Sequence, residues 1–179
     1  MQSPDIRFVR RDEASLAFQV FGAGPDLLVL PGFVSHLEQQ WQFELTARFL
    51  RRLGSFARVC AMDRRGSGLS ERLSPQDLPP LEVLVDDLCA VLDAVDVRRT
   101  SVLAWADGAM QALLFAAMHP ERVERLILFA PAACGSARPD YPWQYDEDDW
   151  AAYLAEIREG WGSTAYFQTL ADRWWPSVA

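Results

Sequence analysis

The sequence predicts an α/β fold in which helices flank a mostly parallel sheet. Residues 27–30 form a continuous run that is apolar on both faces, as in the buried strands of parallel sheets, and further strands are expected at residues 57–62, 100–104 and 126–129. Amphipathic segments with a helical period lie between these runs. Strands that alternate with helices at this spacing are typical of a parallel sheet built from strand–helix–strand units.

The first half of the chain predicts two strands, a helix and a third strand. Residues 15–21 mix apolar and polar side chains like a strand, and a glycine-rich turn leads into the run at 27–30. The next helix carries an apolar face made of Leu45, Phe49, Leu50 and Leu53, and Gly54 is placed to end it. The strand at 57–62 then ends at Asp63.

The second half continues the same alternation. After a loop at 63–70, Pro79-Pro80 open a helix, because proline is tolerated in a first turn. The apolar stripe of this helix is Leu84, Leu88, Val91, Leu92 and Val95. The strand at 100–104 passes directly into a helix from about 107 to 118, and the strand at 126–129 follows.

The composition changes after Pro131, which predicts two domains. Residues 1–134 form the α/β core, and residues 135–179 begin a helical cap. The acidic run at 146–149 suits the start of a helix rather than a metal site. Five of the seven tryptophans lie in this last stretch, where cap packing explains them: Trp143, Trp150, Trp161, Trp174 and Trp175.

Charge and cysteine content exclude several classes of function. The 179 residues carry 17 basic and 25 acidic side chains, a net charge of −8, so neither a nucleic acid nor an anionic membrane is expected as partner. No apolar run approaches the ~18 residues of a membrane span, and the start does not read as a signal peptide. Three widely spaced cysteines and two histidines indicate no disulfide framework, metal site or cofactor, and a cytoplasmic location is expected.

One segment has the pattern of a nucleophile elbow, the sharp strand-to-helix turn that exposes a catalytic residue. The pattern is small-x-nucleophile-x-small, because only small side chains fit the tight turn. Residues 104–108 read Ala-Trp-Ala-Asp-Gly and match it in length and in small residues. Ala106 occupies the place where serine is expected.

These features resemble the α/β-hydrolase fold family. Leu30-Pro31-Gly32-Phe33 is similar to its oxyanion loop, residues 63–70 to its D-x-R-G-x-G-x-S loop, and residues 110–123 to the helix and link after the elbow. More narrowly, residues 31–38, 48–53 and 140–143 resemble hydrolase-like domains fused to actinobacterial class III adenylate cyclases. The resemblance implies an oxyanion hole formed by the backbone N–H groups of Phe33 and Asp107.

Two departures from this family bear on activity. Ala106 has no nucleophilic atom, and no residue matches the family's catalytic histidine or acid, which follow in later strands. The chain therefore resembles a truncated, inactive member. The sequence leaves open whether Ala106 is natural.

Other residues give weaker catalytic candidates. Asp107 is an alternative nucleophile, but that choice shifts the register by one and puts Trp105 where a small residue is needed. We expect Asp107 to begin the helix instead. His36 is expected to be a hydrogen-bonded loop residue rather than a base, His119 to be structural, and Asp63 and Arg65 to hold their loop.

Three functions follow from this pattern. The first is an inert module that binds a small acyl or ester-like ligand and regulates a partner such as a cyclase domain. The second is an ester-type hydrolase that uses Asp107 or residues beyond Ala179. The third is an interaction domain. If the chain ends at Ala179, the strand at 126–129 is an apolar edge without a protecting charge, which predicts self-association or completion by a missing C-terminal segment.

Overall fold

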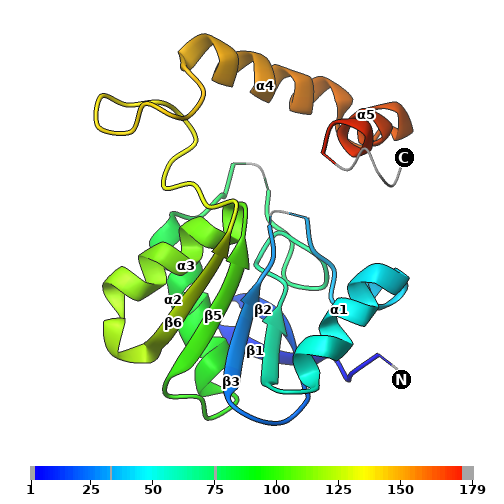
Figure 1. Cartoon of the computed structure of the whole chain (residues 1–179), viewed down its shortest axis with the longest axis vertical. Helices are drawn as coiled ribbons and strands as arrows, with labels where there is room; N and C mark the ends of the chain where they lie inside the picture. The colour runs from blue at the N-terminus through cyan, green and yellow to red at the C-terminus, as the bar shows by residue number, and fades with distance from the viewer. Residues whose placement is uncertain (1–2, 33, 75, 175–179) are drawn as a thin grey trace. The chain divides into compact units, whose positions relative to one another are not determined.

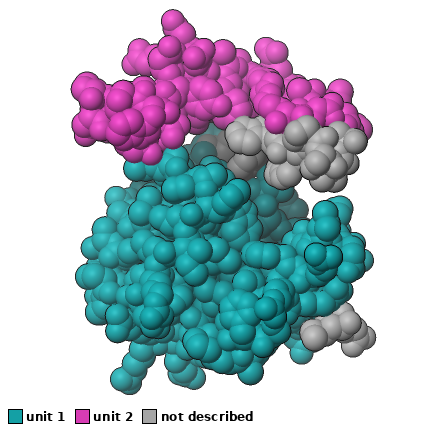
Figure 2. Space-filling view, in the orientation of Figure 1, with its two compact units in different colours: residues 1–133 teal, residues 134–179 magenta. Residues whose placement is uncertain are grey.

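The computed structural model describes residues 3–32, 34–74 and 76–174. The chain divides into two compact units, Met1–Ala133 and Cys134–Ala179 (Figure 2). The first unit contains the sheet, and the second contains two helices.

A six-stranded sheet forms the centre of the first unit, with the strand order β1-β2-β4-β3-β5-β6 (Figure 1). The β1–β2 and β2–β4 pairs are antiparallel, and the β4–β3, β3–β5 and β5–β6 pairs are parallel. The strands are β1 (Arg7–Arg11), β2 (Ala14–Phe21), β3 (Asp26–Leu30), β4 (Arg58–Met62), β5 (Thr100–Trp105) and β6 (Val123–Phe129). The predicted α/β class with a mostly parallel sheet is confirmed.

Helices cover both faces of this sheet. Helix α1 (Glu44–Gly54) lies on one face, and helices α2 (Leu81–Asp93) and α3 (Asp107–Met118) lie on the other (Figure 1). Two short 3₁₀ helices, η1 (Gln39–Trp41) and η2 (Pro120–Arg122), lie in the connections.

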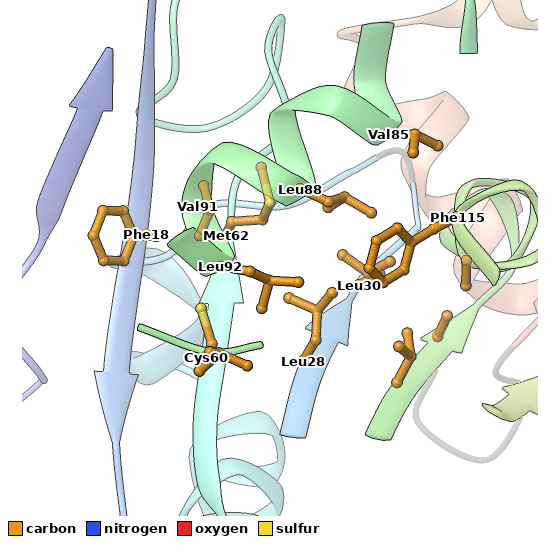
Figure 3. Close-up of a cluster of buried hydrophobic side chains, with 14 of the residues drawn as sticks. Phe18, Leu28, Leu30, Cys60, Met62, Val85, Leu88, Val91, Leu92 and Phe115 are labelled. Atoms are coloured by element: carbon orange, nitrogen blue, oxygen red, sulfur yellow. The ribbon is translucent and has the colours of Figure 1, made fainter. Parts of the chain in front are cut away.

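The strands are apolar on both sides because each side faces a helical layer. In β3, Leu28 and Leu30 belong to the core cluster that α2 and α3 complete with Leu88 and Phe115 (Figure 3). Leu27 and Val29 alternate with them and belong to a second cluster that includes Leu53 of α1. The alternation explains why a run without polar residues is required here.

The strand β1 was not predicted. Its sequence Arg-Phe-Val-Arg-Arg contains three arginines and no buried run, and its side chains are exposed or half-buried. It pairs only with β2, at the edge of the sheet, so no apolar signal marks it.

The predicted apolar face of α1 is partly wrong. Leu50 and Leu53 are buried, but Leu45 is 69% exposed and Phe49 is 45% exposed. The third buried position is Ala47, because the helix packs closely through the 47–50–53 side. A small residue carries too little apolar surface to stand out in a sequence pattern.

The prediction for the edge strand β6 also needs correction. The strand begins three residues earlier than expected and includes Glu124 and Arg125, both exposed. The edge therefore does carry charges that discourage pairing. Its exposed apolar side chains are Ile127 and Phe129, at 50% and 73% exposure.

The second unit consists of helices α4 (Glu147–Gly160) and α5 (Thr164–Trp174). The side chain of Asp146 caps α4 by accepting a hydrogen bond from the Asp149 backbone N–H at 2.9 Å. The acidic run therefore starts a helix, as expected. Aromatic rings pack beside it, with Tyr145 and Tyr153 stacked at a centroid distance of 5.6 Å.

No helix in the described part of the chain is both long enough and apolar enough to cross a membrane. The three cysteines are all free thiols. Burial raises the pKa of the Cys60 thiol to about 12, and burial also raises the pKa of Cys89. Both thiols stay protonated at neutral pH and are poor nucleophiles.

Candidate functional site

The carboxyl ends of the parallel strands define one edge of the sheet. The register pairs Leu30 of β3 with Ala104 of β5, and Trp105 of β5 with Phe129 of β6. The chain leaves β3 for β4 on one side and returns to β5 on the other, so the strand order reverses at β3. Ligands in open α/β sheets bind outside the carboxyl ends of the strands at such a point.

Ala106 forms the sharp turn between β5 and α3. Its φ is 49° and its ψ is −125°, and it is one of four described non-glycine residues with positive φ. Its backbone N–H donates to the Phe129 carbonyl at 3.2 Å, and its carbonyl accepts from the Ala109 N–H at 2.9 Å. The residue is exposed, so the turn presents its methyl group at the surface of the first unit.

Gly108 allows the start of α3 to approach the end of β3. A Cβ atom at this position would lie 2.5 Å from the Leu30 carbonyl oxygen and still closer to that of Pro31. Because both neighbours are backbone atoms, no side-chain rotation relieves the overlap. The small residue at the end of the Ala-Trp-Ala-Asp-Gly segment is therefore a packing requirement.

Gly32 brings the loop after β3 against the turn. A Cβ atom on Gly32 would lie 3.5 Å from the Ala106 Cβ atom, in ordinary van der Waals contact. A small pocket opens beside this contact. It is lined by Leu30, Pro31, Gly32, Ser35, Met62, Arg64 and Gln111.

Asp63 organises the loop that follows β4. The carboxylate is fully buried and accepts hydrogen bonds from the Ser35 hydroxyl at 2.8 Å, the Leu37 N–H at 3.1 Å and the Leu69 N–H at 3.0 Å. Gly68 has φ 54°, and a Cβ atom there would overlap this carboxylate. These contacts give Asp63 the loop-holding role that the sequence predicted.

Comparison with known proteins identifies the family. Residues 25–174 match the family model described as the alpha/beta hydrolase fold. The chain belongs to the alpha/beta hydrolase fold family. The match begins in the turn between β2 and β3, so it covers strands β3 to β6 and both helices of the second unit.

Several characterised hydrolases are similar to this alpha/beta hydrolase chain. A pimeloyl-[acyl-carrier protein] methyl ester esterase of Nitrosomonas europaea is 28% identical over 155 residues, which cover 84% of this chain and 55% of the esterase. Epoxide hydrolase 4 of Mus musculus is 30% identical over 125 residues, which cover 68% of this chain and 33% of that protein. The chain thus spans about half, or less, of the length of these relatives.

Among solved structures, an N-formylmaleamic acid deformylase from Pseudomonas putida S16 is similar with a TM-score of 0.63 and 31% identity. The match covers 86% of this chain and 56% of the deformylase. Cfl2 from Burkholderia cenocepacia has a TM-score of 0.62 at 25% identity and covers 93% of this chain and 53% of its own.

Of the two predicted oxyanion residues, the structure describes only Asp107. Asp107 is the first residue of α3, directly after the turn, so its backbone N–H belongs to the first turn of a helix and has no partner within that helix. Phe33 lies outside the described residues. The oxyanion hole of this alpha/beta hydrolase fold, and the place of Ala106 as its nucleophile position, stay predictions.

The two histidines lie in different parts of the first unit. His36 is in the loop after β3, and its Nδ1 accepts a hydrogen bond from the Gln39 N–H at 3.3 Å. His119 ends α3, where its ring lies 5.8 Å from that of Phe115. A 12-residue helix is about 18 Å long, so His119 is remote from the turn at Ala106.

A buried charge network between the loop after β4, helix α2 and strand β1 was not predicted from the sequence. Asp87 of α2 is 1% exposed and accepts two hydrogen bonds from Arg65, both at 2.6 Å. Arg11 of β1 reaches the same carboxylate at 3.4 Å and Asp86 at 2.7 Å. The hydrogen bonds to Asp87 raise the pKa of Arg65. The network ties the loop after β4 to α2 and β1.

No group of three histidine, cysteine, aspartate or glutamate side chains that could hold a metal ion occurs within residues 3–32, 34–74 and 76–174. The candidate site consists of the positive-φ turn at Ala106, the loop at Gly32 that contacts it, and a small pocket whose lining includes Arg64.

Proposed function

We propose that this chain binds a small acyl or ester-like molecule at the carboxyl edge of its sheet without hydrolysing it. The observation that carries the proposal is Ala106 at the turn between β5 and α3, with φ 49° and Gly32 beside it. The residue at this exposed turn is an alanine, which cannot form a covalent intermediate.

The surroundings of Ala106 favour binding over turnover. The Ser35 hydroxyl donates to the buried Asp63 carboxylate, which already accepts two backbone N–H groups. This geometry suits a loop anchor better than a nucleophile and base. A catalytic base must come within hydrogen-bond reach of its nucleophile, and His119, at the far end of α3, does not meet that requirement.

An ester-type hydrolase is the rival proposal. It would use Asp107 as nucleophile, or histidine and acid residues beyond this chain. The similarity of the chain to a methyl ester esterase and to an epoxide hydrolase supports this rival proposal. The positive φ lies at Ala106 and not at Asp107. It therefore favours binding without hydrolysis over the use of Asp107 as a nucleophile.

A regulatory role toward a cyclase domain and self-association through β6 also stay predictions. The first is supported by the sequence resemblance alone. The charges of Glu124 and Arg125 make the second less favourable than the sequence pattern indicated.

Binding of methyl butyrate, a neutral short ester, tests the proposal. We expect the ester to raise the melting temperature of the chain, by about 3–5 °C at ten times its Kd. Gly32→Val should abolish the rise, because the added methyl groups fill the space against Ala106. Val34→Ala is the matched control, since Val34 lies in the same loop, is 63% exposed and does not line the pocket.

The Cβ atom of Gly32→Val would make an ordinary contact with Ala106 at 3.5 Å, and the rise for each protein is measured from the melting temperature of that same protein without ligand. An equal rise with methyl butyrate in the parent and in Gly32→Val would place any ligand elsewhere. No rise in either protein would contradict the binding function itself.

A further inference from the structure

Helix α1 presents an exposed side on which apolar and positively charged residues alternate (Figure 1). At 3.6 residues per turn, Leu45 and Phe49 lie about one turn apart. Arg48 and Arg52 have the same spacing and fall on the same side, so the four residues share an arc of roughly 100°. All four are exposed, whereas Leu50 on the opposite side is buried. These four residues form the outer face of α1.

Two aromatic residues at the ends of the helix add to the apolar surface of the outer face. Phe43 directly precedes α1 and is 65% exposed, and Phe56 follows it and is 53% exposed. The Arg52 guanidinium lies over the Phe56 ring, 5.8 Å from its centroid. Single exposed apolar side chains are normal, but a set that follows a helix from one end to the other indicates an interaction surface.

The outer face carries a positive charge. Glu44, the acidic residue of α1, pairs with Arg51 at 3.4 Å, and both lie beside the outer face. Arg48 and Arg52 therefore give the face two positive charges. A second copy of the chain that presented the same face would meet like charges, which disfavours self-association here. The charge favours an anionic partner instead.

The net charge of −8, which argued against an anionic membrane as partner, is unevenly distributed along the chain. Residues 134–179 hold 8 acidic side chains against 3 basic ones, so most of the excess belongs to the second unit. Salt screens exposed charges beyond about 8 Å at physiological ionic strength. The charge that a partner meets at α1 is therefore set by the outer face and its immediate neighbours.

A lipid surface suits the outer face better than a groove on another protein. A groove that bound Leu45 and Phe49 would also have to bury the arginines between them, at a cost in desolvation. At a bilayer, the apolar side chains can enter the boundary between headgroups and acyl chains. The arginine side chains can extend outward to the headgroups, where guanidinium groups bind phosphate oxygens.

We propose that the outer face of α1 binds membranes that contain anionic phospholipids. Leu45 and Phe49 enter the interface, and Arg48 and Arg52 bind lipid phosphates. This interaction surface is independent of the ligand proposed for the turn at Ala106, so either proposal can fail without the other.

Sedimentation with phospholipid vesicles tests this assignment. The probes are vesicles of phosphatidylcholine alone and of equal parts phosphatidylcholine and phosphatidylglycerol. We expect the parent chain to bind the mixed vesicles more tightly, and added salt to weaken that binding. Leu45→Gln should weaken it about 10-fold, because the leucine no longer enters the interface. Arg48→Gln should weaken it about 5-fold, the contribution of one basic residue near an anionic surface.

Leu78→Gln and Arg72→Gln are the matched controls. Both residues are exposed and lie in the connection between β4 and α2, the helix on the opposite face of the sheet from α1. Each control should bind the mixed vesicles as the parent does. All four variants should melt within a few degrees of the parent, because the substituted side chains are exposed.

Several results would overturn the proposal. Equal binding of the two kinds of vesicle would show that the headgroup charge is not recognised. Weaker binding by Arg48→Gln but not by Leu45→Gln would exclude insertion of the apolar side chains. Equal losses in the α1 variants and in their controls would place the membrane contact elsewhere. If the vesicles did not bind but soluble polyglutamate did, the outer face would be a surface for an acidic protein and not for a membrane.

Discussion

Replacement of Asp87 by alanine should lower the free energy of unfolding by about 3–5 kcal/mol. The carboxylate is buried, and its removal would leave the Arg65 guanidinium, whose side chain is 12% exposed, without its two hydrogen bonds of 2.6 Å. A buried charge without a partner costs more than the pair contributed. Urea unfolding followed by circular dichroism measures the loss.

Asp86→Ala is the matched control for this prediction. Asp86 precedes Asp87 in α2 and pairs with Arg11 at 2.7 Å, but its side chain is 44% exposed. We expect a loss below about 1 kcal/mol, because exposed ion pairs contribute little. Equal effects of the two substitutions would refute the view that the Asp87 network anchors the loop after β4.

The second large effect is expected for Gly108→Ala. The added methyl group would overlap the carbonyl oxygens of Leu30 and Pro31, so α3 must move away from the end of β3. Overpacking of this kind costs about 1–3 kcal/mol, and rigid backbone neighbours favour the upper end. The higher helix propensity of alanine, worth about 1 kcal/mol, offsets part of that cost.

This substitution should also weaken methyl butyrate binding, because it separates the loop after β3 from the turn at Ala106. For the loss of stability, and not for binding, Gly32→Ala is the control, since the nearest atom to its Cβ would be the Ala106 Cβ at an ordinary 3.5 Å. It should change the free energy of unfolding by less than about 1 kcal/mol. If Gly108→Ala were as stable as the parent chain, the close packing of α3 on β3 described here would be wrong.

The sequence predicted the parallel part of the fold because burial on both faces leaves a clear apolar signal. Residues 27–30 illustrate this, since every position of the run is buried in the sheet. The strand β1 gave no such signal, because it lies at the edge and pairs only with β2. In α1 the buried Ala47 was hidden for a related reason, since alanine contributes little to an apolar pattern.

The candidate site was predicted where backbone geometry restricts residue type. The small residues Ala104 and Gly108 predict the turn, and Gly68 belongs to the D-x-R-G-x-G-x-S pattern of the loop that Asp63 organises. Asp87 and Arg64 were not found in the same way. The acidic pair Asp86-Asp87 lies within a helix, where such pairs are typical of a solvated surface. The dipeptide Arg64-Arg65 does not show that Arg65 pairs with Asp87 while Arg64 lines a pocket.

We propose that the site at Ala106 binds an acyl or ester-like ligand without hydrolysing it. Hydrolysis of p-nitrophenyl butyrate tests it most directly, measured for the parent chain, Asp107→Asn and Ala106→Ser. We expect all three proteins to release p-nitrophenol no faster than buffer, because a methyl group cannot attack and His119 lies at the far end of α3 from a serine restored at position 106. Robust turnover by the parent chain that Asp107→Asn abolishes would contradict the claim and make this chain an enzyme with an aspartate nucleophile. Turnover by Ala106→Ser alone would show that His36 acts as a base.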